Sequence, residues 1–386
     1  MAARGLSKGL RNERLEVGEH LSKPRAATEG RPYSTFCDIN LIARPLLVAR
    51  RRILMLTVLR TIILICLIAP SLYAAKGPGY QSFIVGNPAD APPAPTLSPG
   101  LVLMGGGTDV DAAFQWMCQR AGGGDFLVIR TTGTDAYNPY IQQLCPQMNS
   151  VETIIITTVA GANTAYVSNQ ILNAEALWIA GGDQSTYVNL WRGTAVQTGV
   201  NNLLNVKQAP VGGTSAGLAV LSQFIYTGQT GSVTSSQALA NPFHRYVTLD
   251  RDLFQSTLGA NKLYDSHFVT RDRMGRSIVF LARIVGNGWA TQPRDIGIDE
   301  ETALLVLPTG AATMVGVGAA YFLQAPGPAQ VLADRTPLTY LNIGVYKVPQ
   351  GGTFNLSTWT GTGGVAYTLN VNNGSLTSTQ AGGSIY

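Results

Sequence analysis

Residues 210–220 read PVGGTSAGLAV: an apolar start, a turn of small residues and an apolar continuation. The turn matches the pattern Gly-x-Ser-x-Gly, which in hydrolases places a serine on a sharp bend between a strand and a helix. Such a bend exposes the serine oxygen and directs backbone N–H groups at a developing oxyanion. The stretch therefore predicts Ser215 as a nucleophile, and the alternative is that Ser215 only caps a glycine-rich helix entry.

The sequence around this turn alternates short apolar runs with segments of helical spacing. The runs that predict strands are 101–107, 125–133, 151–159, 175–182 and 209–213, and the segments that predict helices are 108–122, 138–148, 163–174, 183–205 and 218–226. The strand runs are almost continuously apolar, which is typical of parallel strands buried on both faces. We therefore expect an α/β fold with a mostly parallel sheet flanked by helices.

Loops that carry glycine or aspartate follow four of these strands, with the sequences GGGTD, TTGTD, GGDQ and GGTSAG. The carboxyl ends of parallel strands meet at one edge of an open α/β sheet, and ligands bind at that edge. The four loops therefore predict a site there, with Ser215 in it.

The sequence changes character beyond about residue 300, where short apolar runs separated by Gly, Pro and Thr predict antiparallel strands. We read this part as a β-rich C-terminal extension. The expected parts of the chain are an N-terminal extension with a signal peptide at 1–75, a Pro/Gly-rich lead-in at 76–97, the main domain at 98–356 and a β-rich tail at 357–386.

The net charge of +5 comes from the front of the chain. Residues 1–60 hold 12 of the 27 Lys and Arg and 5 of the 22 Asp and Glu, so the remainder carries 15 basic and 17 acidic side chains. A body that is slightly acidic gives no support to nucleic-acid binding. With 45% hydrophobic and 13% charged residues, the chain can bury a large core.

A basic segment followed by a short apolar run indicates an export signal. Arg50–Arg52 precede the apolar run 62–69, and small residues follow it. This pattern predicts a secretory signal peptide cleaved after Ala74 or Ala75, with Met55 as an alternative start. The run is shorter than the roughly 20 apolar residues of a membrane helix, so a retained anchor is the less favoured alternative. We expect a periplasmic or extracellular protein without membrane contact after cleavage.

Two of the four cysteines lie in the part that signal cleavage would remove, and Cys118 and Cys145 remain. An even number in an exported protein predicts one disulfide between them, and the alternative is two small buried apolar side chains. The chain has no Cys-x-x-Cys, and His244 and His267 are the only histidines after the signal. We therefore expect no metal site and no cofactor.

A serine nucleophile needs a base, and the choice lies between these two histidines. His267 lies in the dense polar stretch LYDSHFVTRDRMGR (263–276), whereas His244 lies in a turn-like segment. We predict His267 as the base; a solvated helix face or an ion-pair network in a loop is the alternative interpretation of the stretch. An extended conformation here would put residues 265 and 267 on one face. The orienting carboxylate stays open among Asp265, Asp299, Glu300 and Glu301.

Four motifs in the order GGDQ, GGTSAG, DSHFVTRDRMGR and GIDEETA resemble the cyanophycinase family of serine peptidases, which are related to the α-aspartyl dipeptidases. The resemblance implies a fold similar to that of class I glutamine amidotransferases. The similarity covers roughly residues 98–356. It implies Ser215 as nucleophile, His267 as base and Glu300 as the third member of a triad. It places along the substrate pocket Gln184, Asp265, Ser266, Arg271, Arg273 and Arg276.

The resemblance also implies an oxyanion hole formed by the Ala216 N–H and by a glycine N–H, from either Gly106 or Gly182. The chain departs from the family pattern at Ser266, because glutamine commonly precedes the catalytic histidine there. The prediction of cyanophycin as substrate is therefore weaker than the prediction of serine-peptidase chemistry.

The family cleaves cyanophycin, a polymer of aspartate units that each bear arginine on the β-carboxyl, and releases β-Asp-Arg dipeptides. A cluster of three arginines suits aspartyl carboxylates, because a guanidinium group binds a carboxylate through two hydrogen bonds. Asp265 or Asp183 would receive a substrate arginine. We therefore expect an exported serine exopeptidase whose partner is a peptide or cyanophycin-like polymer, and a homodimer is left open.

Three other functions compete with this one. Another secreted aspartyl or isoaspartyl peptidase would use the same fold and the same residues. An esterase of the α/β-hydrolase type would take Asp250 or Asp252 as its acid, in the order nucleophile, acid, histidine. A catalytically silent binding module would keep the fold and lose the reaction.

Overall fold

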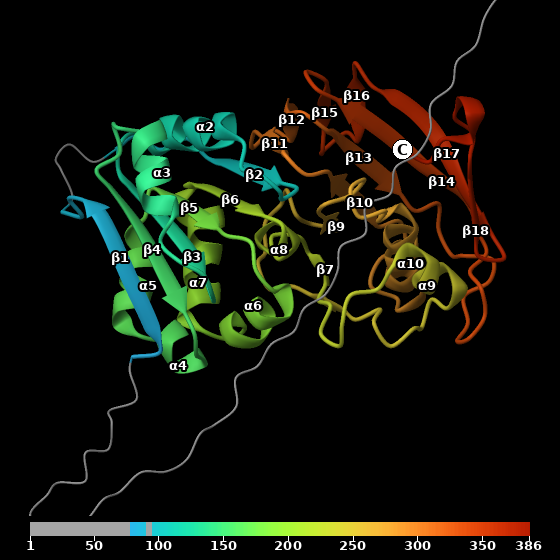
Figure 1. Ribbon diagram of the computed structural model, residues 1–386, viewed down its shortest axis with the longest axis horizontal. Helices are drawn as coiled ribbons and strands as arrows, with labels where there is room; N and C mark the ends of the chain where they lie inside the picture. Colours follow the sequence, from blue (N-terminus) through green and yellow to red (C-terminus); the bar gives the residue numbers. More distant parts are fainter. Residues whose placement is uncertain (1–77, 90–94) are drawn as a thin grey trace, which may run out of the picture. The chain divides into compact units, whose positions relative to one another are not determined.

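The computed structural model describes residues 78–89 and 95–386. The predicted signal peptide, Met55, Cys37 and Cys66 lie outside these residues, so the expectations about them stay predictions. The described part contains two large sheets with their helices (Figure 1). Among these residues, no helix is both long and apolar enough to span a membrane.

The first sheet has ten strands within the described residues, and its centre is parallel. The parallel strands, in their order across the sheet, are β4 (Ser150–Ile156), β3 (Asp125–Arg130), β5 (Ala176–Ile179), β6 (Pro210–Thr214) and β2 (Gly100–Met104). Antiparallel strands extend both ends of the sheet: β1 (Tyr80–Gly86), β11 (Thr302–Val306), β12 (Ala311–Gly316), β15 (Thr353–Asn355) and β16 (Thr360–Thr362). The expected α/β class is confirmed, with the parallel strands at the centre of a mixed sheet.

Helices cover both faces of this sheet because its central strands are apolar on both sides. Leu101 and Leu103 of β2 pack into one core, whereas Val102 and Met104 pack into another. This alternation follows from the two-residue period of a strand. The helices of the first core are α4 (Val159–Ala162), α5 (Ala165–Asn173), α6 (Gln184–Trp191) and α7 (Ala195–Asn202); those of the second are α2 (Asp111–Ala121) and α3 (Tyr137–Leu144).

The second sheet has eight strands within the described residues, and three of them, β10, β9 and β7, run parallel. Its order is β18 (Ser375–Ser378), β17 (Val365–Asn372), β14 (Tyr340–Pro349), β13 (Ala319–Gln324), β10 (Arg294–Ile298), β9 (Lys262–Asp265), β7 (Phe224–Tyr226) and β8 (Leu249–Arg251). The helices α9 (Ser235–Ala240) and α10 (Met274–Gly286) share its apolar core. The expected β-rich C-terminal region is confirmed, and residues 357–386 add strands to both sheets.

The chain crosses between the two sheets at two places that matter for the site. β6 of the first sheet leads through α8 (Ala216–Ala219) to β7 of the second. β10 of the second sheet ends at Ile298, and β11 of the first begins at Thr302, so residues 299–301 form the other crossing. Side chains from both sheets can therefore meet beside Ser215.

Two of the predicted helices are wrong in extent. The helix expected at 218–226 is one turn, α8, followed by β7, because Ser222 Oγ donates to Ala219 O and Phe224 O and turns the chain. The helix expected at 183–205 breaks at Gly193, whose φ is 69°, into α6 and α7 and continues as a π-helical turn at Leu203–Lys207.

The structure contains the disulfide between Cys118 and Cys145. It joins α2 to the segment that follows α3, and both cysteines are fully buried in the apolar core on that face of the first sheet. The predicted disulfide is therefore confirmed, and the two cysteines are also buried, as the alternative interpretation required.

Candidate active site

Ser215 occupies a sharp bend between β6 and α8, as the Gly-x-Ser-x-Gly pattern predicts. Its φ of 54° and ψ of −114° lie in a region that a residue with a side chain rarely adopts. Gly217 lets α8 approach β5 closely, because a Cβ atom there would collide with Ile179 O. The Ser215 N–H donates to Met104 O of β2 at 3.1 Å and fixes the bend to the sheet. Backbone strain of this kind costs roughly 1–3 kcal/mol and concentrates at functional sites.

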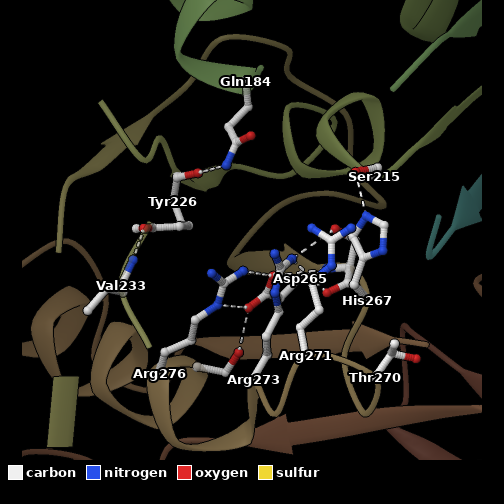
Figure 2. A network of polar contacts seen from close by, with 12 residues as sticks. Gln184, Ser215, Tyr226, Val233, Asp265, His267, Thr270, Arg271, Arg273 and Arg276 are labelled. Carbon is white, nitrogen blue, oxygen red and sulfur yellow. Dashed lines mark hydrogen bonds and ion pairs between the residues drawn. The ribbon is translucent and has the colours of Figure 1, made fainter. Parts of the chain in front are cut away.

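His267 lies beside this bend on the loop that follows β9. Its Nε2 is 2.8 Å from Ser215 Oγ, although 52 residues separate the two (Figure 2). The His267 N–H donates to Gly105 O at 2.7 Å, and its φ is 47°. Gly106, with a φ of 100°, presses against the imidazole ring, and a Cβ atom there would collide with it. The loop after β2 thus holds the imidazole from one side.

Glu300 completes a chain of hydrogen bonds from the nucleophile. Its Oε1 lies 2.5 Å from His267 Nδ1. A carboxylate only accepts, so Nδ1 carries the proton and Nε2 is left to accept from Ser215 Oγ. The arrangement Ser215–His267–Glu300 therefore has the geometry of a serine, a base and its orienting carboxylate.

The other three carboxylates considered for this position have different partners. Asp299 accepts from the N–H groups of Val269 and Thr270 and from the Thr270 hydroxyl. Glu301 accepts from the Thr108 hydroxyl at 3.2 Å. Asp265 points to Arg276 instead of the imidazole. The segment through residues 265–267 is not extended, because β9 ends at Asp265 and the chain turns at His267.

The surroundings of His267 favour its neutral form. Burial lowers the pKa of the imidazole below its ordinary value, Arg271 and Arg273 act in the same direction, and Glu300 opposes them. Only 6% of the residue is exposed. A neutral imidazole can take a proton, which is the form that a general base needs.

A pocket of about 300 Å³ opens beside Ser215. All six residues that the sequence assigns to substrate binding line it: Gln184, Asp265, Ser266, Arg271, Arg273 and Arg276. Gln184 stands on one wall at the start of α6 and donates from Nε2 to Tyr226 O at 3.1 Å (Figure 2). Opposite it, the stretch from Asp265 to Arg276 forms the polar floor.

Asp265 and two arginines form a buried ion-pair network in that floor (Figure 2). Arg276 binds both carboxylate oxygens, with Nε 2.8 Å from Oδ2 and Nη2 2.5 Å from Oδ1, and Arg273 adds a contact at 3.2 Å. Burial alone would raise the pKa of Asp265, but Arg276 and Arg273 hold it below its ordinary value. The floor therefore carries two guanidinium charges against one carboxylate.

Arg273 and Arg271 differ in how freely they can contact a ligand. Arg273 Nη1 also donates to Ser266 O at 2.8 Å and to Ser266 Oγ at 3.2 Å. Burial lowers the pKa of Arg273 to about 10, so it stays charged at neutral pH. The Arg271 side chain is 54% exposed, and its Nε lies 3.7 Å from Glu300 Oε1. Arg271 is thus the most accessible cation of the three.

Two of the three predicted oxyanion residues, Ala216 and Gly182, line the pocket together with Ser215. Ala216 is the first residue of α8, where backbone N–H groups have no partner within the helix. Gly106 faces the imidazole ring instead. We therefore favour Gly182 over Gly106 as the second N–H donor of the oxyanion hole. The oxyanion hole itself stays a prediction.

The residues considered as an alternative base or acid have other partners. His244 Nδ1 accepts from the Tyr246 N–H, and Asp250 forms an ion pair with Arg192 at 2.9 Å. Asp252 accepts from Gln223 Nε2. In the described part of the chain, no group of three His, Cys, Asp or Glu side chains is arranged to hold a metal ion.

The wall that β7 contributes to the pocket was not predicted from the sequence. Tyr226, Thr227 and Gly228 line it, and the Tyr226 ring lies 4.7 Å from the Arg276 guanidinium carbon. The missed signal is the run Phe-Ile-Tyr, since aromatic and β-branched residues favour strands. Because the sequence pattern predicted a helix over this run, these residues were not expected at the site.

Comparison with known proteins adds a distant relative. No family model matches the chain. A curated cyanophycinase from Geminocystis herdmanii is 22% identical over 187 residues, which are 47% of this chain and 63% of that protein. The match therefore spans less than two thirds of the relative's length.

Two solved structures are weakly similar. A peptidase from an acI-B1 actinobacterium has 15% identity and a TM-score of 0.45, over 67% of this chain and 98% of its own. A protein described as a peptidase E from Listeria monocytogenes has 13% identity and a TM-score of 0.40, over 57% and 99%. Similarities of this strength carry no functional argument. The sequence match to the cyanophycinase confirms the family resemblance that the four motifs predict.

Proposed function

We propose that this protein is an exported serine exopeptidase of the cyanophycinase type, which releases β-aspartyl-arginine dipeptides from their polymer. One observation carries the proposal: Ser215 Oγ lies 2.8 Å from a largely buried His267, at a pocket whose floor is cationic. The similarity to a cyanophycinase supports the same class of reaction.

The geometry suggests how the bond would be cleaved. Ser215 Oγ attacks the amide carbonyl carbon while His267 Nε2 takes the hydroxyl proton. Glu300 accepts from Nδ1–H and stabilises the imidazolium that forms. The N–H groups of Ala216 and Gly182 would bind the oxyanion. His267 then gives its proton to the leaving amine, and a water molecule, activated by the same imidazole, hydrolyses the acyl-enzyme.

The charges of the pocket favour an acidic group on the substrate. Arg273 and Arg276 together outweigh Asp265, and Arg271 presents an exposed guanidinium nearby. A carboxylate of an aspartyl unit would be bound bidentately by such groups. Asp265 is already saturated by its own arginines, so the rim residue Asp183 is the better partner for a substrate arginine.

The test is incubation with cyanophycin and, in parallel, with a panel of β-aspartyl and α-aspartyl dipeptides, with products identified by mass. We expect dipeptides from cyanophycin, and a loss of about 10⁶-fold in kcat for Ser215→Ala with unchanged far-UV circular dichroism. Near-wild-type turnover by purified Ser215→Ala would overturn the mechanism. Cleavage of the dipeptides without attack on the polymer would move the assignment to the second candidate.

The second candidate is another aspartyl or isoaspartyl peptidase of the same fold. It is favoured by Ser266, which bonds to Arg273 through both its carbonyl and its hydroxyl and offers no long amide to a substrate. A catalytically silent binding module is separated from both candidates by a fluorophosphonate probe. Covalent labelling of Ser215, detected by mass, is expected for a peptidase and absent for a binder.

Export is part of the proposal. The basic segment and the apolar run before Ala75 support it, and the disulfide is consistent with an oxidising compartment. N-terminal sequencing of the protein recovered from its native host tests it. A mature N-terminus near residue 75 is expected, and a protein that keeps the apolar run would contradict it.

A further inference from the structure

Tyr386, far along the chain from the candidate triad, contacts the loop that carries the base and two of the arginines. Its hydroxyl donates to Asp272 Oδ1 at 2.9 Å and accepts from the Met274 N–H at 3.0 Å. Asp272 lies between Arg271 and Arg273, and Met274 is the first residue of α10. One hydroxyl thus joins the end of the loop to the start of the helix.

The ring of Tyr386 reaches the other end of the same loop. It packs edge-on against Phe268, with ring centroids 6.1 Å apart, and against Tyr321 of β13, at 5.8 Å. Phe268 directly follows His267 and is fully buried. Burial, together with its bond to Asp272, raises the pKa of the Tyr386 hydroxyl above its ordinary value, so the group stays a donor.

The loop needs such support because its backbone is strained. His267 and Asp272 both have a φ of 47°, which is unfavourable for residues with side chains. Asp299 holds the middle of the loop through Val269 and Thr270. Asp272 is held by the Ser235 hydroxyl, which donates to its carbonyl, and by Tyr386.

We propose that Tyr386 is a positioning residue, whose hydroxyl fixes Asp272 and thereby sets the two flanking arginines for the substrate carboxylate. The inference deepens the proposed function and rests on it for the role of Arg271 and Arg273. Tyr386 touches neither the nucleophile nor the base, so its effect falls on substrate binding and not on the activation of Ser215.

Tyr386→Phe removes only the hydroxyl and tests the proposal directly. We expect KM for the best aspartyl substrate to rise roughly 3- to 10-fold with little change in kcat, as the loss of one hydrogen bond predicts. The rate of Ser215 labelling by a fluorophosphonate, which needs no arginine, stays at the wild-type value. Tyr340→Phe is the matched control, because it removes another tyrosine hydroxyl, on β14 of the second sheet, that donates to Gly327 O.

The double variant with Asp272→Ala identifies the path of the effect. If Tyr386 acts through Asp272, the double variant is no worse than Asp272→Ala alone. Additive effects, or an equal loss in Tyr340→Phe, overturn the proposal.

Hydrogen exchange of the amides in residues 268–274 gives a readout that does not depend on activity. Faster exchange is expected in Tyr386→Phe but not in Tyr340→Phe, even where no aspartyl substrate is cleaved. The exchange rate therefore tests the positioning role of Tyr386 separately from the peptidase activity. Unchanged exchange in Tyr386→Phe rejects the positioning role.

Discussion

Ser215, directly after β6 of the first sheet, and residues 266–273, directly after β9 of the second, contribute the two halves of the candidate site, and they are held in different ways. Ser215 is fixed by main-chain geometry, between β6 and α8, with one hydrogen bond to β2. His267 and two of the arginines lie on an irregular loop whose shape depends on the side chains of Asp299, Ser235 and Tyr386. Substitutions at the first half should change the reaction, whereas many at the second should change binding or stability.

Glu300→Gln, in the segment that joins the two sheets, gives the largest expected effect after substitution of Ser215 itself. The amide keeps the shape but can donate to Nδ1, which disturbs the imidazole tautomer and removes the charge that stabilises the imidazolium. We expect kcat to fall by about 10³- to 10⁴-fold. Glu301→Gln, whose side chain accepts from Thr108, is the matched control and should retain most activity. A similar loss in both variants would mean that the crossing between the sheets matters only for folding.

Asp265→Asn should mainly affect stability. It leaves Arg276 buried without a carboxylate, and breaking a buried ion pair costs about 3–5 kcal/mol. Urea unfolding followed by circular dichroism measures the change. Asp183→Asn replaces one exposed helix cap by another and should cost less than about 1 kcal/mol. Equal midpoints for the two variants would refute the structural role given to Asp265.

The pH dependence of kcat/KM tests the electrostatics of the base. The pKa of His267 is lowered, so the neutral form persists as pH falls and activity is lost only below the ordinary imidazole value of 6.5. Arg271→Ala removes one of the lowering charges and should move this acidic limb upward. An acidic limb at or above 6.5 in the wild type would be inconsistent with a desolvated imidazole.

Asp295→Asn should have the smallest effect. It should raise the free energy of unfolding, whereas Asp265→Asn should lower it. Asp295 on β10 is fully buried, and no described residue gives either oxygen a hydrogen bond of normal geometry. Burial, and the charge of Asp265 beside it, raise its pKa well above the ordinary 3.8. The unfolded state therefore loses this proton first, and the wild type becomes less stable as pH rises above that value.

Asparagine cannot ionise, so this variant should gain stability relative to the wild type as pH increases. The gain is at most about 1.4 kcal/mol for each pH unit. Urea unfolding of both proteins at about pH 5 and pH 6 measures it. A gain that is equal at the two pH values would show that ionisation of Asp295 is not the cause.

The contrast between the two halves also explains what sequence could predict. The parallel strands and the bend at Ser215 follow from local patterns, namely continuous apolar runs and Gly-x-Ser-x-Gly. The family resemblance singled out Glu300, but residue types alone could not separate it from Asp299 and Glu301, because the turn at 299–301 decides which side chain faces the imidazole. The saturation of Asp265 and the contacts of Tyr386 depend on packing between residues far apart in sequence, which no local pattern encodes.

The crossing at residues 299–301 has a consequence for how activity would arise during folding. Ser215 belongs to one sheet, His267 to the other, and Glu300 to the segment that joins them. A chain that has completed only the first sheet has a hydroxyl with no base to activate it. Under the proposed mechanism, Ser215 would therefore gain its base only once both sheets have formed, and a partly folded chain would have no activated hydroxyl.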